Sequence, residues 1–247
     1  ENVYIQPNAG DAGGALGAAL YAWHVLLGKP RKFVMEHAYY GKSYNEAEIT
    51  AFLKENNLKY EKIDDVSKMA ERMVDALLNK KVIGLSQGRF EWGPRALGNR
   101  SILADPRSAQ MKDTVNSKIK FRELFRPFAP VVLEEEATKW FELGKADMQY
   151  PQRFMLMVSN VAPGQDSKIA AVSHMGTGRL QTVRKEWNPL YYEATRKFGE
   201  ATGVPVLLNT SFNLRAEPIV TTPADAYATY SNSDIDYLVL DNFILSK

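Results

Sequence analysis

Short apolar runs separated by helix-length segments constrain this chain more than any other feature of its sequence. The runs lie at residues 82–86, 154–158, 204–208 and 236–240, and a strand-like stretch opens the chain at 2–7. Each run has the length of a buried strand. Because helix signals lie between the runs, strands and helices mix along the chain, which predicts an α/β sheet with helices packed on it.

Five helices are expected where a cap precedes apolar residues at three- and four-residue spacing. The first follows a glycine-rich turn and stops at Gly28, and the fourth ends near Gly203. The caps of the other four are Ser43 with Glu46, Asp65, Asn188 before Pro189, and Thr222 before Pro223. A soft domain boundary is expected near residue 40.

The composition is that of an ordinary globular protein, with 45% hydrophobic residues and a net charge of +2. A charge this close to zero argues against wholesale nucleic-acid binding and leaves any anion site to local clusters of basic residues. The absence of cysteine excludes disulfides and thiol catalysis, which agrees with a cytoplasmic location. No apolar run approaches the roughly 20 residues of a membrane-spanning helix, so no membrane partner is expected.

Residues 87–107 place four arginines among glycines and prolines directly after an apolar run. A guanidinium group is permanently charged and offers a planar fork of donors, which suits a phosphate or carboxylate ligand. The alternative is a solvated loop in which Glu91 and Asp105 pair two of the arginines. This segment alone leaves both interpretations open. The arginines are Arg89, Arg95, Arg100 and Arg107.

Three further segments carry candidate ligand groups, each with a structural alternative. Residues 116–130 interleave basic and aromatic residues, a pattern that also fits an amphipathic surface helix. Residues 207–213 end an apolar run in amides and hydroxyls, at the place where α/β sheets bind ligands, although a plain turn is common there. Residues 173–183 hold His174 and Arg179 around two glycines, and a lone histidine is more often structural than catalytic.

Taken together, these segments resemble the C-terminal block of the NodU-type O-carbamoyltransferases, which modify nodulation factors and antibiotics. The resemblance rests on the stretches GRFEWGPRALGNRSILADPR, KIKFRELFRPFAP, HMGTGRLQTV and PVLLNTSFNLRAEPIV and runs over most of the chain. It implies a YrdC-like twisted mixed sheet with packed helices at residues 41–247. A remnant of an actin/hexokinase-type, metal-bearing domain is implied at residues 1–40, and Glu1 in place of Met agrees with a fragment of a longer protein.

The resemblance also implies a reaction and a set of site residues. Carbamate derived from carbamoyl phosphate would be activated with ATP to carbamoyl adenylate, for transfer to a hydroxyl of a sugar or secondary metabolite. Mg²⁺ would be held mainly by the phosphates, because no carboxylate cage is apparent. The implied catalytic residues are Lys120, Arg126 and Arg179, and the implied substrate and nucleotide contacts are Arg95, Arg122, His174, Thr210, Ser211 and Asn213.

Two departures from the family pattern affect these expectations. The family's His-x-Asp-Gly-Thr is replaced by the four residues 174–177, HMGT, which removes a carboxylate. The metal-binding histidine pair would lie upstream of Glu1, so only Asp11, resembling the remaining metal ligand, and the phosphate-contacting turn at Gly13 and Gly14 are present. One carboxylate cannot hold a transition metal, so a divalent metal, most simply iron, is expected only in the full-length protein.

Two other functions stay open at this point. A basic groove could bind RNA, although the near-zero net charge argues against nucleic acid. The basic turns could also only pair with acidic residues of a scaffold domain. A homodimer is left open as well.

Overall fold

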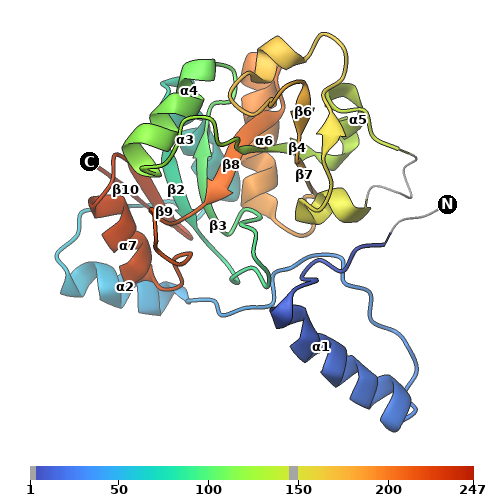
Figure 1. The fold of residues 1–247 in the computed structure, drawn as a ribbon. Helices are drawn as coiled ribbons and strands as arrows, with labels where there is room; N and C mark the ends of the chain where they lie inside the picture. Colours follow the sequence, from blue (N-terminus) through green and yellow to red (C-terminus); the bar gives the residue numbers. More distant parts are fainter. Residues whose placement is uncertain (1–3, 145–149) are drawn as a thin grey trace.

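The computed structural model describes residues 4–144 and 150–247, apart from the side chain of Asp11. One mixed sheet has the strand order β1-β10-β9-β2-β3-β8-β4-β7, and β5 and β6 form a small second sheet (Figure 1). The predicted α/β fold with a mixed sheet and packed helices is confirmed. The strands are β1 (Glu61–Lys62), β2 (Ile83–Ser86), β3 (Arg100–Ala104), β4 (Ala129–Leu133), β5 (Ser159–Asn160), β6 (Thr177–Gly178), β7 (Gln181–Val183), β8 (Val206–Ser211), β9 (Tyr237–Leu240) and β10 (Phe243–Ser246).

Strand direction brings the candidate segments to one end of this sheet. β2 is parallel to β9 and antiparallel to β3, whereas β8 is antiparallel to both β3 and β4. β4 in turn is parallel to β7. Strands β2, β8 and β9 therefore end where β3, β4 and β7 begin, and we call this side the Ser211 end of the sheet.

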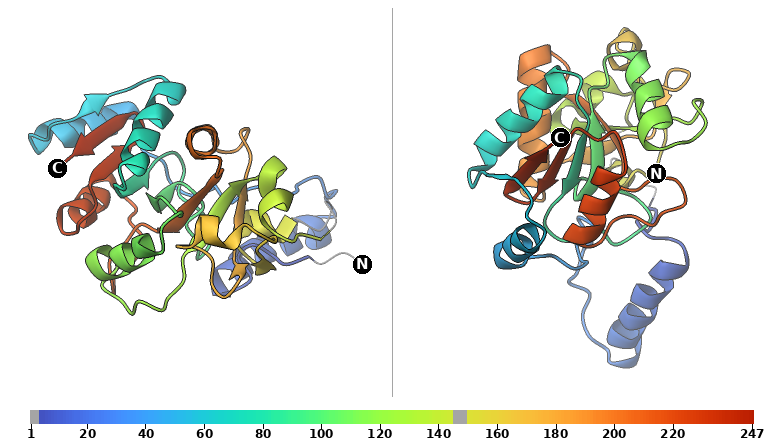
Figure 2. Two further views of the ribbon diagram at one scale, coloured as in Figure 1. Left: turned by 90° about the horizontal axis from the view of Figure 1, so that it is seen from above. Right: turned by 90° about the vertical axis from the view of Figure 1, so that its left-hand side faces the viewer.

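Helices cover both faces of the sheet and bury its alternating side chains. α3 and α6 pack on one face, and α4 and α7 lie on the other (Figure 2). Along β8, Val206 and Leu208 belong to one core cluster and Leu207 to the other, as the two-residue period of a strand requires. The α-helices are α1 (Asp11–Tyr21), α2 (Glu46–Glu55), α3 (Val66–Leu78), α4 (Ala109–Thr114), α5 (Ala137–Trp140), α6 (Pro189–Thr202) and α7 (Pro223–Ser231).

Short helical turns complete the described parts of the chain. They are η1 (Ala22–Leu26), η2 (Val115–Ile119), η3 (Glu134–Glu136), η5 (Tyr150–Phe154) and η6 (Asp166–Ile169). Within residues 4–144 and 150–247, no helix combines the length and the apolar character needed to cross a membrane.

Most predicted helix ends are confirmed, and one cap is corrected. Asp65 accepts a hydrogen bond from the backbone of Lys68 at 2.8 Å, and Gly203 ends α6 in the left-handed conformation. The box predicted from Ser43 with Glu46 is wrong. Asn45 and Glu48 form it instead, because Asn45 is the last extended residue before the helix begins at Glu46.

Two predicted strands are absent. The apolar run at 154–158 follows η5 as irregular chain, and Phe154 and Met155 are buried in a third core cluster with Met35 and Leu97. Residues 4–7 of the opening stretch are irregular as well, and the rest of that stretch lies outside the described residues. In the run at 154–158, Phe154 and Met155 fill a local core instead of joining a sheet.

The helical segment formed by α1 and η1 stands apart from the sheet (Figures 1 and 2). None of the side chains of η1 is buried, and Trp23, Leu26 and Leu27 are 50 to 70% exposed. The segment after it returns to the body, where Met35 and Ala38 are buried. The predicted boundary near residue 40 remains a prediction.

Removing residues 1–28 should therefore leave the sheet intact. We expect the melting temperature to change by no more than about 4 °C, since the deleted part contributes little buried apolar surface. The comparison variant is Phe212→Ala, because this fully buried ring should cost about 3–5 kcal/mol when it is removed. Thermal unfolding of both proteins checks this, and a deletion as destabilising as Phe212→Ala would contradict it.

Candidate functional site

Lys120 is buried after η2 and bonds the end of β8. Its Nζ donates to Asn213 Oδ1 at 2.6 Å, to the carbonyl oxygens of Ser211 and Asn213 at 2.7 and 3.0 Å, and lies 3.2 Å from Ser211 Oγ. An ammonium group has three donors, so these four oxygens saturate it. Lys120 therefore fixes Ser211 and Asn213 against the end of η2.

The same burial makes the charge of Lys120 sensitive to its surroundings. Burial and the nearby guanidinium of Arg122 lower the pKa of Lys120 to about 7, and Glu217 acts in the opposite direction. An anion that arrives beside the ammonium favours its charged form. Ligand binding at this position and protonation of Lys120 are thus coupled.

A cavity of about 220 Å³ lies beside Lys120 and is strongly basic. Arg122 donates to Asn116 Oδ1 at 2.7 Å, and Arg126 pairs with Glu123 at 2.8 Å. Glu123 is the only acidic residue in this lining, against four basic ones. We call it the cationic cavity; it is lined by Lys120, Arg122, Glu123, Arg126, Ser211, Asn213, Leu214, Arg215 and Ala216.

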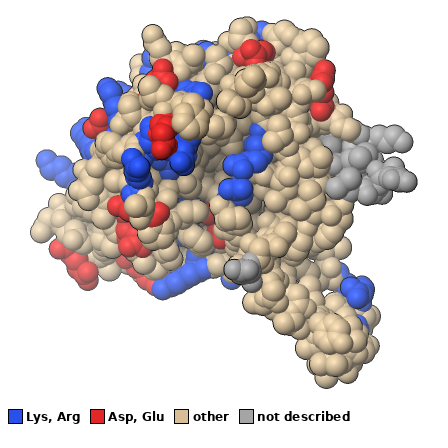
Figure 3. Space-filling model, in the orientation of Figure 1, with Lys and Arg blue, Asp and Glu red and all other residues tan. Residues whose placement is uncertain are grey.

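A second cavity of about 220 Å³ adjoins it and is mainly apolar. Arg126 lines the first cavity and Pro127 the second, so the chain passes directly from one to the other. The ring of Phe128 belongs to the second cavity and lies 4.7 Å from the Arg122 guanidinium. Figure 3 shows Lys and Arg side chains on two sides of a hollow in this face. The apolar cavity is lined by Pro127, Phe128, Ala129, Val158, Val172, His174, Thr177, Gly178 and Arg179.

Arg179, at the apolar cavity, lies two residues before Gln181, whose side chain donates to the Leu97 carbonyl oxygen at 2.8 Å, so the loop that carries Arg95 runs beside it. Partial burial and the charge of Arg95 lower the pKa of Arg179. Among residues 4–144 and 150–247, neither arginine takes part in a hydrogen bond or an ion pair. Two neighbouring guanidinium groups without a carboxylate form an arrangement that an anionic ligand would stabilise.

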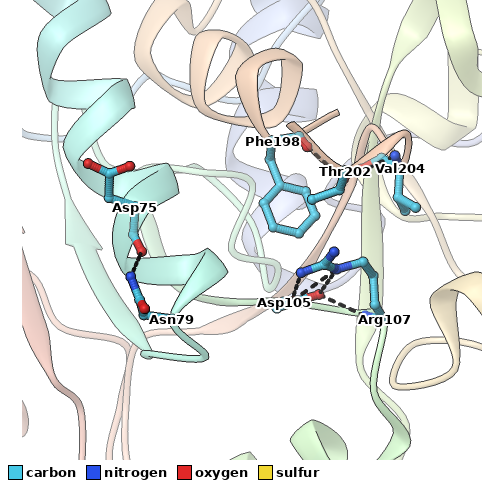
Figure 4. A network of polar contacts seen from close by, with 7 residues as sticks. All are labelled: Asp75, Asn79, Asp105, Arg107, Phe198, Thr202 and Val204. Carbon is cyan, nitrogen blue, oxygen red and sulfur yellow. Dashed lines mark hydrogen bonds and ion pairs between the residues drawn. The ribbon is translucent and has the colours of Figure 1, made fainter. Parts of the chain in front are cut away.

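The other arginines of the 87–107 segment serve the fold. Arg89 donates to the carbonyl groups of Tyr40 and Gly41 at 2.9 and 3.0 Å. Arg100 is 1% exposed and donates to three backbone carbonyl groups, those of Gln87, Gly88 and Asn99. Arg107 is held by Asp105 and lies 5.3 Å from the Phe198 ring centroid (Figure 4).

The solvated-loop alternative is therefore correct for one carboxylate only. Asp105 pairs with an arginine as expected. Glu91 is buried and accepts backbone N–H groups instead.

The remaining candidates lie at different places. His174 lines the apolar cavity within a tight turn closed by Thr177, and Thr210 pairs with Ile102 in the ladder between β8 and β3. Gly13 lies within helix α1 and not in the turn expected from the sequence, and a Cβ here would lie 1.9 Å from the Asn8 carbonyl oxygen, so this position requires glycine.

The α1 turn and the two cavities belong to separate parts of the molecule. Gly13 and Gly14 lie in α1, away from the end of β8 (Figure 1). The side chain of Asp11 lies outside the described residues. In the part of the chain that the structure describes, no three His, Cys, Asp or Glu side chains are grouped to hold a metal ion.

Sequence reasoning missed several residues of the site. Arg215 extends the basic lining, and its Nη1 donates to the Phe121 carbonyl oxygen at 3.3 Å. Val158 and Val172 supply apolar walls. The signal for Arg215 was its place two residues after Asn213; the valines carry no signal in the sequence, because an apolar residue in a cavity wall resembles one in the core.

Comparison with known proteins identifies the family. Residues 74–247 match the family model described as "Carbamoyltransferase C-terminus". The chain belongs to this family. The predicted resemblance to the NodU-type carbamoyltransferases is confirmed, with both cavities inside the matched region.

Three relatives illustrate this carbamoyltransferase C-terminal region. The whole chain is 43% identical to nodulation protein NolNO of Sinorhizobium fredii and 43% identical to nodulation protein NolO of Bradyrhizobium diazoefficiens, covering 36% and 45% of them. The third relative is the 3'-hydroxymethylcephem-O-carbamoyltransferase of Amycolatopsis lactamdurans, with 34% identity. This match covers 91% of the chain and 40% of the relative. The chain thus spans less than half the length of these relatives.

Crystal structures of HypF also overlap with the carbamoyltransferase C-terminal region. Their TM-scores are 0.46 and 0.48 at 14% identity, and they cover 76% and 74% of the chain. Values this low do not establish a common fold.

The lowered pKa of Lys120 predicts a stability that depends on pH. The pKa is about 7 in the folded protein against 10.5 for an ordinary lysine, so between these values the unfolded chain binds a proton that the folded protein lacks. The free energy of unfolding of the wild type relative to Lys120→Met should consequently rise as the pH increases from about 7 toward 10.5. Urea unfolding at several pH values measures this difference. The exposed Lys118→Met is the control and should show no such rise.

Proposed function

We propose that the chain is the part of an O-carbamoyltransferase that forms carbamoyl adenylate from ATP and from carbamate released by carbamoyl phosphate. The observation that carries this proposal is the junction of an apolar cavity with a cationic one at Arg126 and Pro127. A nucleotide has this division, because its base is apolar and flat and its phosphates are anionic. The adenine is assigned to the apolar cavity, and the phosphates to the arginines around it.

The arrangement of charges supports the chemistry of adenylate formation. A carbamate oxygen forms a bond to the α-phosphorus, the bond between the α-phosphorus and its bridging oxygen breaks, and pyrophosphate leaves with the electron pair. Arg95, Arg126 and Arg179 would stabilise the charge that develops on the phosphate oxygens. No protein nucleophile is needed, since catalysis of this kind rests on positioning and electrostatics.

The Ser211–Asn213 segment would position the carbamate. Its hydroxyl and amide groups are held by the Lys120 ammonium at 3.2 and 2.6 Å, so they do not depend on solvent for their orientation. Lys120 itself would act through this segment and through its charge. In this proposal Mg²⁺ is bound by the phosphates, and Glu123 is the acidic residue in the lining of the cationic cavity.

Transfer to the acceptor is assigned to a longer protein. The relatives are more than twice as long as the chain, and one is named for a hydroxymethyl acceptor. We therefore place the small-molecule hydroxyl acceptor, and a divalent metal held in part by Asp11, in a domain to which residues 1–40 belong. The exposed apolar side chains of α1 and η1 support such a neighbour. A cytoplasmic location remains part of the proposal.

ATP binding tests the nucleotide assignment directly. ATP should raise the melting temperature of the wild type, because a ligand of the folded state stabilises it. Arg179→Ala should weaken the affinity roughly 10- to 100-fold, the loss of one charge-assisted contact. Arg196→Ala, which removes a cation paired with Glu193 and Glu200 on α6, is the matched control and should bind normally.

Two results would count against this assignment. Equal affinities of Arg179→Ala and the wild type would remove Arg179 from the site. Steeply salt-dependent binding of duplex RNA without any effect of ATP would instead favour the RNA-binding alternative.

The reaction itself predicts an isotope exchange. Labelled pyrophosphate should enter ATP only when carbamoyl phosphate is present, in a protein that joins this chain to the remainder found in its relatives. Arg126→Ala should slow the exchange at least tenfold if its guanidinium stabilises the departing phosphates. The exposed Lys118→Ala should leave the exchange unchanged. Exchange without carbamoyl phosphate would point to another acyl group.

A further inference from the structure

The loop at residues 91–99 has no regular secondary structure, yet a buried carboxylate binds its backbone. Glu91 Oε1 accepts the N–H groups of Leu97 and Asn99, both at 2.8 Å, and of Arg100 at 3.1 Å. Glu91 is 2% exposed, so these bonds are shielded from water. We call this arrangement the Glu91 clamp. It closes the loop onto its own first residue.

Side chains from distant segments bond the carbonyl groups of the same loop. They come from the chain before α2, from the residue after β2, from β7 and from the middle of β8, so several parts of the fold fix the path of this loop. A solvated loop would leave such groups to water. The donors are Tyr39, Gln87, Gln181 and Asn209, and the acceptors are the carbonyl groups of Ala96, Leu97 and Gly98, at 2.7 to 3.0 Å.

Gly98 adds a steric restraint to these bonds. Its φ is +105°, and a Cβ at this position would lie 2.2 Å from the ring of Tyr191, which is fully buried. Only glycine allows the backbone to adopt this conformation against the ring. The loop therefore cannot move toward α6 without displacing a core side chain.

Arg95 directly precedes Ala96 and Leu97, whose carbonyl groups accept hydrogen bonds from Asn209 and from Gln181, two residues after Arg179. The segments that carry Arg95 and Arg179 therefore lie side by side, and the charge of Arg95 lowers the pKa of Arg179. Like charges repel, so in a mobile loop Arg95 would turn away from Arg179 toward solvent. Buried polar groups are costly unless they are bonded, and a network of this extent is more than a surface connection requires. Arg95 is the charged residue that directly precedes the part of the loop fixed by this network.

We propose that Glu91 is a positioning residue, which, by holding the backbone of residues 97–100, keeps Arg95 beside Arg179 as one half of an anion site for the nucleotide phosphates. The inference rests on the proposed function, because it takes the phosphates of ATP as the anion. Glu91 touches no ligand in this arrangement. Its effect on binding passes through Arg95 alone.

A double-mutant cycle on ATP affinity tests this route. Glu91→Gln keeps the shape of the side chain but replaces charge-assisted bonds by neutral ones, and should weaken ATP binding roughly tenfold. In an Arg95→Ala background, the same substitution should have no further effect, since the side chain that it positions is absent. Glu200→Gln, on the exposed side of α6, is the control and should leave the affinity unchanged.

Amide hydrogen exchange tests the clamp itself. In Glu91→Gln, the N–H groups of Leu97 and Asn99 should exchange faster than in the wild type, while those of β8 keep their protection. Glu91→Ala should lose no more affinity than Arg95→Ala does. If Glu91→Ala fails to fold, the ATP affinity and the amide exchange of Glu91→Gln still test the role of Glu91.

The outcomes separate this inference from the proposed function. A wild-type protein that binds neither ATP nor pyrophosphate overturns both. A wild-type protein that binds ATP overturns the inference alone in either of two cases: Glu91→Gln keeps full affinity, or it loses the same factor with and without Arg95. Loss confined to the background that contains Arg95, with faster exchange at Leu97, supports it.

Discussion

The bond between the Lys120 ammonium and the end of β8 is the contact on which the site depends. It joins the end of η2 to the end of β8, because Lys120 bonds residues that follow it by 91 and 93 positions in the sequence. A buried ammonium is tolerated only where oxygens surround it, and here Ser211 and Asn213 supply all of them. The buried charge of Lys120 thus fixes the hydroxyl group of Ser211 and the amide group of Asn213 at the cationic cavity.

The arginines show how one residue type can serve two purposes. Arg100, buried on backbone carbonyl groups, and Arg107, held by Asp105, strengthen the sheet and its α6 face. Arg179 instead lines the apolar cavity, and the loop that carries Arg95 is bonded to Gln181, two residues after Arg179. A permanently charged group is useful in both settings, since it neither loses its proton when buried nor needs one when a ligand arrives. The structural arginines differ from Arg95 and Arg179 only in the hydrogen-bond and ion-pair partners that the fold supplies.

The sequence predicted local features well and long-range ones poorly. The cap at Asp65, the stop at Gly203 and the strands at 82–86, 204–208 and 236–240 follow from neighbouring residues, and the structure agrees with them to within a few residues. The sequence did not predict strand β3, because it lies within a segment rich in arginine and glycine. Its burial is decided by β2 and β8 on either side. Likewise, the run at 154–158 has strand-like composition but no strand beside it.

The sequence predicted the side chains of the candidate site, but it did not predict that they are divided between a cationic and an apolar cavity. Family resemblance indicated Lys120, Ser211 and Asn213, which lie together, but spacing gave no sign that Lys120 is saturated by the other two. Glu91 appeared only as a counter-ion for an arginine. Its hydrogen bonds to three N–H groups depend on a loop that folds back on itself. No periodicity in the sequence predicts such a loop conformation.

The pairing of β2 with β9 has a consequence for synthesis of the chain. β2 pairs with β9, the penultimate strand, and β10 beyond β9 carries the last paired residue of the sheet. Until β9 has left the ribosome, the inner strand β2 has one side without its neighbour. The nascent polypeptide must therefore be kept from associating through that side, and a product that stops before β9 would lack a completed sheet.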